Sequence, residues 1–409
     1  MNWELKNFDI KYYTIDSWTF SSNMDKKNFN KTFILCSECE KKIIAGQKYM
    51  SEKLKTSLAR MPLYILPHFL LENPLDKEDL DNFSDKIQKS FKIIKNYESI
   101  KEAKKELEQI KYYYKDKKLY FTLDMLFYKK QQQSTKIIKT IKDIDPEIIF
   151  EIEDSIQKVQ KEEVFSNDRF NISLESFVYN LPIKQKENSP TNYRYILEIY
   201  EKIFLKIKIN KKKMIQNFLR LLGAIHFGNH EFIGSTENTK IAEKIKSQNK
   251  LLLFLENMNL FEKEDKMNIE ELGIKDENIK KYINTVGYDE QKTALFLLGY
   301  LMGEIGKKEA KGNDENKKPI LNKLNYKGSD FKKIQKLYVT VFGKLKQEKI
   351  LKYYEKLHGI IGFLINKNEN TWNLNASENE YYILSGFGYS NMWKEKVDKK
   401  DENIIQEVK

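Results

Sequence analysis

The stretch Thr293-Ala-Leu-Phe-Leu-Leu-Gly-Tyr-Leu-Met302 decides the fold class of this chain. It is apolar on every side of a helix, which is typical of the central helix of a bundle. Gly299 and Gly303 lie about one turn apart, and their lack of side chains predicts that a second helix approaches closely there. The stretch is too short to span a membrane, which takes about 18 apolar residues or more. The sequence therefore predicts a helical bundle built around this segment.

The residues that follow extend the bundle towards the C-terminus. A Gly/Asn/Lys/Glu loop is expected at 306–318, ending at Pro319. Beyond it, apolar residues recur at helical spacing and predict a long amphipathic helix: Phe331, Ile334, Leu337, Val341 and Leu345. We expect residues 266–393 to form a C-terminal helical bundle and 394–409 to be a charged, mobile tail.

The middle of the chain, residues 76–265, has mixed patterns and predicts a mostly helical domain with some strand. Ser99 and Glu102 have the spacing of a capping box, which predicts the start of a helix. Residues 119–127 alternate between apolar and mostly polar side chains, which predicts a strand. Further elements are expected in this order: a helix after Asp145-Pro146, a polar loop at 184–192, and helices at 193–208 and 211–226.

The first 75 residues predict a small, irregular module. Residues 33–36 form a short strand-like run, and a helix is expected from about Glu38 to beyond Gly46. No internal repeat is visible. The expected fold class is thus α+β and predominantly α-helical, with a zinc-ribbon-like N-terminal module, a mixed middle domain and a C-terminal bundle.

The charge balance points to a polyanionic partner. The 409 residues carry a net charge of +12 and give a pI of about 9.1, and a basic surface attracts nucleic acid. Nearly all the basic residues are lysine, since arginine occurs only at Arg60, Arg169, Arg194 and Arg220. Lysine holds phosphate but lacks the planar fork that reads guanine, so phosphate tracking is favoured over arginine-based base reading. Arg169, Arg194 and Arg220 are minor candidates for such reading.

Cysteine and leader patterns indicate where the chain works. Two cysteines cannot make a disulfide framework, which fits a reducing compartment. The first residues lack the form of a signal peptide. We therefore expect a cytoplasmic protein without a membrane partner.

Cys36-Ser-Glu-Cys39 is the sharpest local motif. Two thiolates at this spacing can hold one side of a tetrahedral zinc ion. A closed site needs two more ligands, and His68 is the only histidine nearby. A pair of reduced cysteines in a turn is the competing interpretation. His226 and His230 have the spacing of two ligands on one helical face, but Gly228 between them predicts a helix end.

Several basic and polar clusters are candidates for contact with nucleic acid. Lysines at such sites hold phosphates, and side-chain amides can bond base edges. Lys211, Lys212 and Lys213 open a predicted helix, and the free backbone amides of its first turn also favour phosphate. The candidates are Lys129, Lys130, Gln131, Gln132, Lys211, Lys212, Lys213, Lys323, Lys327, Lys332 and Lys333. For each cluster, solvated lysine in a lysine-rich chain is the alternative.

Recognisable catalytic motifs are missing from the sequence. Gly303-Glu-Ile-Gly306-Lys307-Lys308 resembles a phosphate loop, but Leu301 stands at the position of the first glycine and no Ser or Thr follows Lys307. No GxSxG or HExxH motif occurs. We therefore expect no enzymatic activity and no catalytic residue.

Several short segments form an ordered set along the chain. The set begins with Tyr12-Tyr13-Thr-Ile-Asp16 and continues through the Cys36–Cys39 motif. It runs over nearly the whole chain with these further segments: Tyr64-Ile-Leu-Pro67, Leu126-Phe-Tyr-Lys-Lys-Gln131, Leu197-Glu-Ile-Tyr200, Phe296-Leu-Leu-Gly299 and Lys318-Pro319-Ile-Leu-Asn-Lys-Leu324. In this order the segments resemble the large-subunit family of the type I-B CRISPR effector (Cascade).

The resemblance implies a non-catalytic subunit of an RNA-guided antiviral surveillance complex. Such a subunit would bind guide RNA and target DNA and help to recognise the motif adjacent to the target. It would also stabilise the R-loop and recruit a helicase-nuclease, and backbone subunits of the complex would be its protein partners. In RNA-guided recognition of this kind the protein reads the adjacent motif and base pairing reads the target. The C-terminal bundle would be the small-subunit-like part.

One departure from the family bears on zinc. Members usually carry a second CxxC upstream of the Tyr12-Tyr13 segment, and this sequence has none. Either an N-terminal part is missing or half of a zinc ribbon has been lost, and both explanations stay open. The alternative function is a stand-alone single-strand-binding protein that uses lysines and its 24 Tyr and 24 Phe residues. An enzyme with an unrecognised site and a purely structural scaffold are further alternatives.

Overall fold

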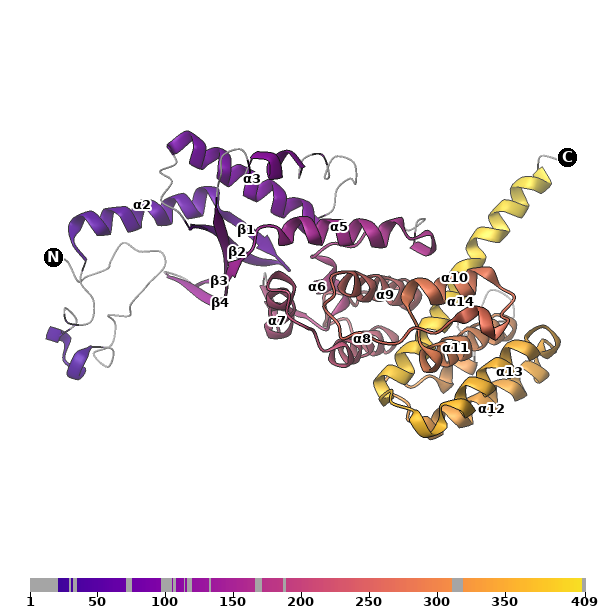
Figure 1. Cartoon of the computed structure of the whole chain (residues 1–409). Helices are drawn as coiled ribbons and strands as arrows, with labels where there is room; N and C mark the ends of the chain where they lie inside the picture. The colour runs from indigo at the N-terminus through magenta and orange to yellow at the C-terminus, as the bar shows by residue number, and fades with distance from the viewer. Residues whose placement is uncertain are drawn as a thin grey trace. The chain divides into compact units, whose positions relative to one another are not determined.

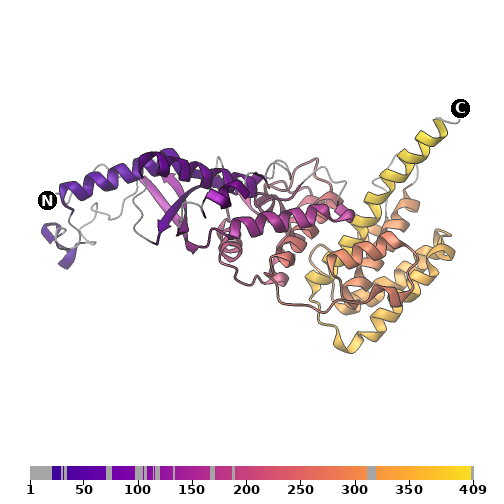
Figure 2. The same cartoon turned by 45° about the horizontal axis from the view of Figure 1, so that its top comes forward.

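A computed structural model describes most of the chain as two compact units. The first comprises residues 1–154 and 173–175, and the second comprises 155–172 and 176–409. Figures 1 and 2 show the elements of each unit in two views. The described residues are 21–28, 31, 35–70, 76–96, 105, 108–113, 115, 120–131, 134–165, 171–186, 189–310 and 319–406.

The first unit combines helices with a four-stranded antiparallel sheet of order β1-β2-β3-β4. Two hairpins, β1–β2 and β3–β4, make the sheet, and β2 pairs with β3 in its centre. The elements are η2 (Ser22–Met24), η3 (Lys26–Asn28), α2 (Ser37–Lys53), β1 (Lys55–Leu58), β2 (Met61–Phe69), α3 (Lys77–Asn96), β3 (Phe121–Gln131), β4 (Ser134–Ile144) and α5 (Ile148–Lys161), of which α5 continues into the second unit.

Aromatic side chains pack on both faces of this sheet. Phe69 and Phe121 are cross-strand partners, and Phe83 of α3 lies against both, with ring centroids 5.2 and 4.8 Å away. Tyr64 and Tyr128 point to the other face, because side chains alternate along a strand. Their rings stack with centroids 4.4 Å apart. The alternation seen in the sequence at 119–127 thus reflects the two faces of β3.

The turn between β1 and β2 is strained, and a residue distant in sequence stabilises it. Ala59 and Arg60 both have positive φ, 51° and 59°, which costs a residue with a side chain roughly 1–2 kcal/mol. Glu175 stabilises the turn: its Oε1 accepts the Ala59 N–H at 2.9 Å. Leu174 N–H bonds Ile94 O at 3.1 Å, which fixes this short returning segment to the end of α3. Burial raises the pKa of Glu175, although nearby Lys95 opposes the shift.

The second unit is almost wholly helical. A two-stranded hairpin, β5–β6, is the sheet described in it. Its elements are η4 (Glu163–Phe165), α6 (Ser176–Asn180), β5 (Lys184–Lys186), β6 (Ser189–Thr191), α7 (Arg194–Phe204), α8 (Lys211–His226), α9 (Ile241–Asn257), η5 (Ile269–Leu272), α10 (Glu277–Val286), α11 (Glu290–Glu309), η6 (Pro319–Lys323), α12 (Phe331–Gln347), α13 (Leu351–Lys367), η7 (Glu369–Thr371) and α14 (Ala376–Gln406).

Helix α11 is the centre of this unit, as its apolar sequence predicted. Its residues from Gln291 to Met302 are buried, except Tyr300, which is partly exposed. Glycines let α14 approach it to backbone contact. A Cβ on Gly299 would lie 1.8 Å from Ile383 O, and one on Gly386 would lie 1.8 Å from Phe296 O. The close helix contact expected at Gly299 and Gly303 is confirmed.

A buried polar network joins α9, α10 and α14. Asn249 Nδ2 donates to Tyr282 Oη at 2.8 Å and to Ser385 Oγ at 2.7 Å. Tyr381 Oη donates to Asn249 Oδ1 at 2.9 Å, and Tyr288 Oη lies 3.0 Å from Ser385 Oγ. Because buried polar groups are costly unless bonded, the network admits one arrangement of these helices.

The sequence predictions of elements are confirmed at several places. The fold class, α+β and predominantly helical, is confirmed by the two sets of elements. The expected helices near 38–46, 193–208, 211–226 and 331–345 correspond to α2, α7, α8 and α12. Ile148 N–H bonds Asp145 O at 3.1 Å, so the Asp145-Pro146 start of α5 is also confirmed.

Other predictions differ from the structure. The loop expected at 184–192 contains the β5–β6 hairpin, because Lys184 also bridges to Phe232 and so gains a tertiary partner. The loop expected from 306 begins later, since α11 continues to Glu309. The backbone of the expected tail is helical as far as Gln406. Most of the helix predicted from Ser99 lies outside the described residues, and the zinc-ribbon-like form of the N-terminal module is not seen in its described part.

The predicted domain limits stay predictions. The limit at 75/76 lies within the first unit and that at 265/266 within the second. None of the described helices has both the length and the apolar character that crossing a bilayer requires.

Substituting Gly299 tests the contact between α11 and α14. We expect Gly299→Ala to destabilise the protein by about 1–3 kcal/mol, because the new methyl group meets backbone atoms that cannot rotate away. Gly359→Ala is the matched control: it also lies in a helix, but nothing is within 4 Å of its added Cβ. Helix propensity alone predicts that this control stabilises by up to about 1 kcal/mol. Urea unfolding monitored by circular dichroism measures both, and equal effects would contradict the described packing.

Candidate nucleic-acid interface

Helices α12 and α13 form a hairpin with a strongly basic outer side. They lie side by side in both views (Figures 1 and 2). Residues 331–367 contain nine lysines, two glutamates, and neither arginine nor aspartate, giving 9 − 2 = +7. The buried positions of α12 are Ile334, Leu337, Val341 and Leu345. The helical period therefore places Lys332, Lys336 and Val339 on the opposite side, in solvent.

Four of the predicted lysines lie at the start of this hairpin or in the residues just before it. Lys323 ends η6, Lys327 lies in the following turn, and Lys332 and Lys333 open α12, and all four are exposed. Lys336, one turn further, was not predicted. Lys336 shares a shallow surface depression with Lys332, and its lining residues are Lys332, Gln335, Lys336, Val339 and Thr340. We call Lys323, Lys327, Lys332, Lys333 and Lys336 the 323–336 lysine group.

An aromatic contact fixes the hairpin that carries these lysines. His358 of α13 stacks on Tyr338 of α12, with ring centroids 4.1 Å apart and planes 13° apart. His358 Nε2 also lies 3.2 Å from Tyr338 O. Burial lowers the pKa of His358, so its ring is neutral at pH 7 and acts as a packing group. The lone histidine of this helix is thus structural.

Large apolar side chains lie exposed among the lysines of the hairpin. Tyr353 is 70% exposed, and Val339, Phe342 and Phe363 are exposed as well. Aromatic rings of this kind can stack on bases while neighbouring lysines hold phosphates. Exposed rings and lysines therefore occur together on this hairpin.

Lys211, Lys212 and Lys213 are in a different position, because each has an acidic partner within the chain. Lys211 Nζ lies 2.5 Å from Glu264 Oε2, and Lys213 Nζ lies 3.1 Å from Glu198 Oε2. Lys212 Nζ is 3.4 Å from Asn373 O and 3.9 Å from a carboxylate oxygen of Glu378. The first turn of α8 is capped by Asn210, whose Oδ1 accepts the Lys213 N–H at 2.9 Å. All three lysines thus have partners within the chain, and their expected phosphate contact stays a prediction.

Glu264 shows how closely this ion-pair cluster is built. Its Oε2 contacts both Lys211 and the buried Lys292, the latter at 2.8 Å. Burial disfavours the charged carboxylate, yet the two lysines hold the pKa of Glu264 below its ordinary value. A phosphate competing for Lys211 would therefore leave Glu264 with one partner fewer.

The β3–β4 hairpin carries the remaining predicted lysines. Lys129 pairs in register with Lys136, and Lys130 pairs with Thr135. The end of the hairpin thus has lysine on both strands, and Lys130 and Lys136 are exposed. The Gln131 backbone ends β3, while Gln132 lies outside the described residues, as does Arg169. Arg194 and Arg220 are exposed at the start of α7 and on α8.

The Cys36–Cys39 motif caps a helix. Cys36 is the N-cap of α2, and its Sγ accepts the Cys39 backbone N–H at 3.3 Å. This bond lowers the pKa of the Cys36 thiol, and the same pairing raises that of Cys39. Both thiols are exposed, and no group of three or more potential metal ligands occurs among the described residues. Two thiols supply half of a tetrahedral donor set, so the described residues do not fit a closed zinc site.

His226 and His230 do not share a helical face. Helix α8 ends at His226, and Gly228 has a left-handed φ of 65°, so the helix end predicted between the histidines is confirmed. His226 stacks on Tyr326, with centroids 4.2 Å apart. His230 Nδ1 lies 3.4 Å from Ser235 Oγ.

Both units match domains of one protein family. The central domain of CRISPR-associated protein TM1802 matches residues 3–144, and the C-terminal domain of the same family matches residues 172–401. The chain belongs to this CRISPR-associated family. The first match lies within the first unit. The second, apart from residues 173–175, lies within the second unit and includes the α12–α13 hairpin. No curated protein matches the chain.

The two cysteines of this family member can be tested for a metal role through α2. We expect Cys36→Ser and Cys39→Ser to leave the helix unchanged, because serine is a good N-cap and the Cys39 thiol caps nothing. Cys36→Ala should lower the hydrogen-exchange protection of the first turns of α2 about five-fold. Equal damage from Cys36→Ser and Cys39→Ser, with zinc found by elemental analysis of the wild type, would show instead that both thiols hold metal.

Proposed function

We propose that this chain is the non-catalytic large subunit of a type I-B RNA-guided surveillance complex. In this role it binds guide RNA and target DNA, assists recognition of the adjacent motif, stabilises the displaced strand and helps to recruit a helicase-nuclease. Membership of the CRISPR-associated family supports the setting. The single observation that carries nucleic-acid binding is the outward lysine side of the α12–α13 hairpin.

The chemistry of this hairpin suits backbone contact. Lysine neutralises phosphate as a point charge and does not discriminate between bases. A surface of this kind holds a strand of any sequence, as a displaced strand requires, and leaves sequence reading to base pairing. Such binding weakens steeply with salt, because each neutralised phosphate releases counterions.

The exposed aromatic side chains favour a second candidate, a stand-alone single-strand-binding protein. Tyr353, Phe342 and Phe363 could stack on successive bases without any partner subunit. The two candidates share the interface and differ in what accompanies the chain in the cell.

Purification of the tagged chain from its host separates these candidates. We expect guide RNA and backbone subunits to co-purify, because the large subunit is held in a fixed assembly. Sequencing of the bound RNA and mass spectrometry of the bound proteins measure this. Recovery of the chain alone, or with RNA of random sequence, would favour the stand-alone protein.

Removing charge from α12 tests the interface itself. Each lysine that neutralises a phosphate of a single strand contributes about 0.7 to the slope of log K against log salt. We therefore expect Lys332→Gln with Lys336→Gln to reduce this slope by about 1.4, measured by fluorescence anisotropy with a labelled single strand.

A double variant of equal charge provides the control for this measurement. Lys211→Gln with Lys213→Gln removes two lysines that have partners within the chain, and the slope should not change. If the control lowered the slope and the α12 variant did not, the interface would lie at the start of α8.

A further inference from the structure

The turn after α8 presents an exposed phenylalanine on a fixed backbone. Phe227 is 70% exposed, and its neighbours from His226 to Glu231 are exposed as well. Three bonds close the helix end: Phe227 N–H to Gly223 O at 3.0 Å, Gly228 N–H to Ile225 O at 3.2 Å, and Asn229 N–H to Ala224 O at 2.8 Å. The exposed ring therefore stands on an ordered turn.

Two further rings support Phe227 from below. Tyr326 is 8% exposed, His226 stacks on it with centroids 4.2 Å apart, and Phe227 lies edge-on to His226 at 4.9 Å. Gly223 lets Tyr326 pack closely against α8, because a Cβ on Gly223 would lie 3.2 Å from Tyr326 Cβ. Partial burial lowers the pKa of His226, so its ring is neutral at pH 7. The result is a three-ring cluster with Phe227 outermost.

Cations flank this cluster. Lys327 follows Tyr326 directly and is exposed, and it belongs to the 323–336 lysine group. Arg220 lies seven residues before Phe227, two turns along the same side of α8, and is exposed too. Its guanidinium carbon is 5.7 Å from the centroid of Phe232. A ligand at this place would meet a flat apolar ring and positive charge together.

We propose that Phe227 is a stacking platform for one unpaired nucleobase of a strand whose phosphates follow the 323–336 lysine group. Every nucleobase has a flat π-face, and its phosphate carries the negative charge that these lysines and Arg220 attract. An exposed phenylalanine alone is common on protein surfaces. Here the ring is held on an ordered turn and backed by two stacked rings, of which Tyr326 directly precedes Lys327 of the lysine group.

The inference rests on the proposed nucleic-acid binding and adds a place where the register of the strand is fixed. Lysines along α12 hold a flexible chain of phosphates at any position. A stacked base restricts the strand at one point, and this restriction does not depend on salt. The platform thus contributes affinity of a different physical kind from the lysine group.

The test measures the affinity of the full chain for a labelled single strand at several salt concentrations, with DNA and RNA of one sequence. Loss of one stacked base weakens binding about ten-fold. We expect Phe227→Ala and Phe227→Leu to weaken binding by about this factor without changing the salt slope, and Phe227→Trp to bind like wild type. A strand with one abasic site in the bound register should bind wild type as weakly as the intact strand binds Phe227→Ala. The DNA and RNA arms show which strand the platform takes.

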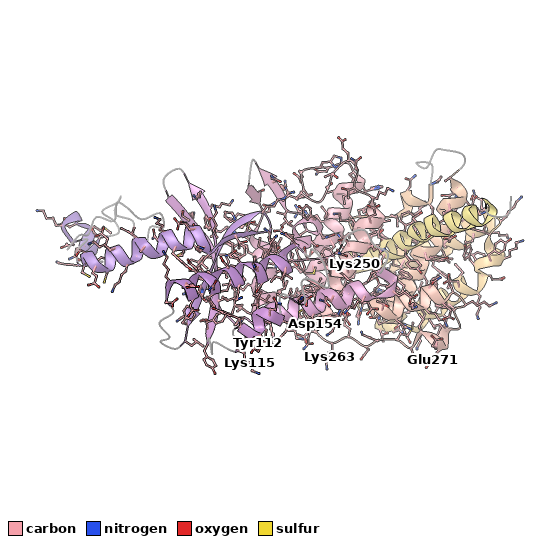
Figure 3. All side chains as sticks on the ribbon, turned by 90° about the horizontal axis from the view of Figure 1, so that it is seen from above. Tyr112, Lys115, Asp154, Lys250, Lys263 and Glu271 are labelled. Carbon is pink, nitrogen blue, oxygen red and sulfur yellow. The ribbon has the colours of Figure 1, made fainter. Side chains whose placement is uncertain are left out.

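Tyr112→Ala is the matched control, since Tyr112 is an exposed ring in the first unit, 71% exposed and labelled in Figure 3. It should bind like wild type. Unchanged affinity of Phe227→Ala in both arms overturns the platform, while the slope change on α12 still supports the proposed function. Full binding by Phe227→Leu also overturns it and shows that the ring is an apolar contact for protein. Absence of binding by the wild type overturns both proposals.

Discussion

The backbone contact between α11 and α14 is the constraint on which the second unit depends. Where Gly299 and Gly386 remove the side chains, each helix meets the other's carbonyl groups, and no flexible atom remains between them. This sets the depth of α14 in the bundle, so that Ser385 and Tyr381 reach Asn249. Helices α12 and α13 pack against α11 in turn. The helices that carry the candidate interface therefore pack on a pair of helices whose contact depends on Gly299 and Gly386, 386 − 299 = 87 positions apart in sequence.

Lysine has two separate uses in this chain. Lys211 and Lys292 hold the half-buried carboxylate of Glu264 and stabilise the fold, and Lys213 pairs with Glu198 on the surface. The 323–336 lysine group lies on exposed surface beside a shallow depression. Net charge alone does not separate these uses, because every lysine adds equally to the total of +12. The proposed interface rests on the second kind, which is exposed and lies within the residues that match the C-terminal family domain.

The sequence predicted what depends on local pattern and missed what depends on distant partners. The apolar run at 293–302, its two glycines and the period of α12 each reveal an element within a short window. The acidic partners of Lys211 and Lys213, Glu264 and Glu198, cannot be identified from such a window. His226 at the end of α8 and Tyr326 are likewise in contact only through tertiary packing, since 326 − 226 = 100 positions separate them in sequence. The β5–β6 hairpin was read as a loop because it is short, polar and contains Pro190, and its bridge to Phe232 is tertiary. Lys336 was within reach, since it lies one turn after Lys332 on a helix already predicted.

The hydrogen bond from Ala59 N–H to Glu175 joins segments that are synthesised at different times. The chain leaves the first unit after Asp154 and returns to it only for residues 173–175. On the ribosome, the strained turn at Ala59–Arg60 therefore emerges long before the carboxylate that holds it. Domains generally complete their folding as units during synthesis. Residues 173–175 can join the first unit only after residues 155–172 of the second unit have been synthesised.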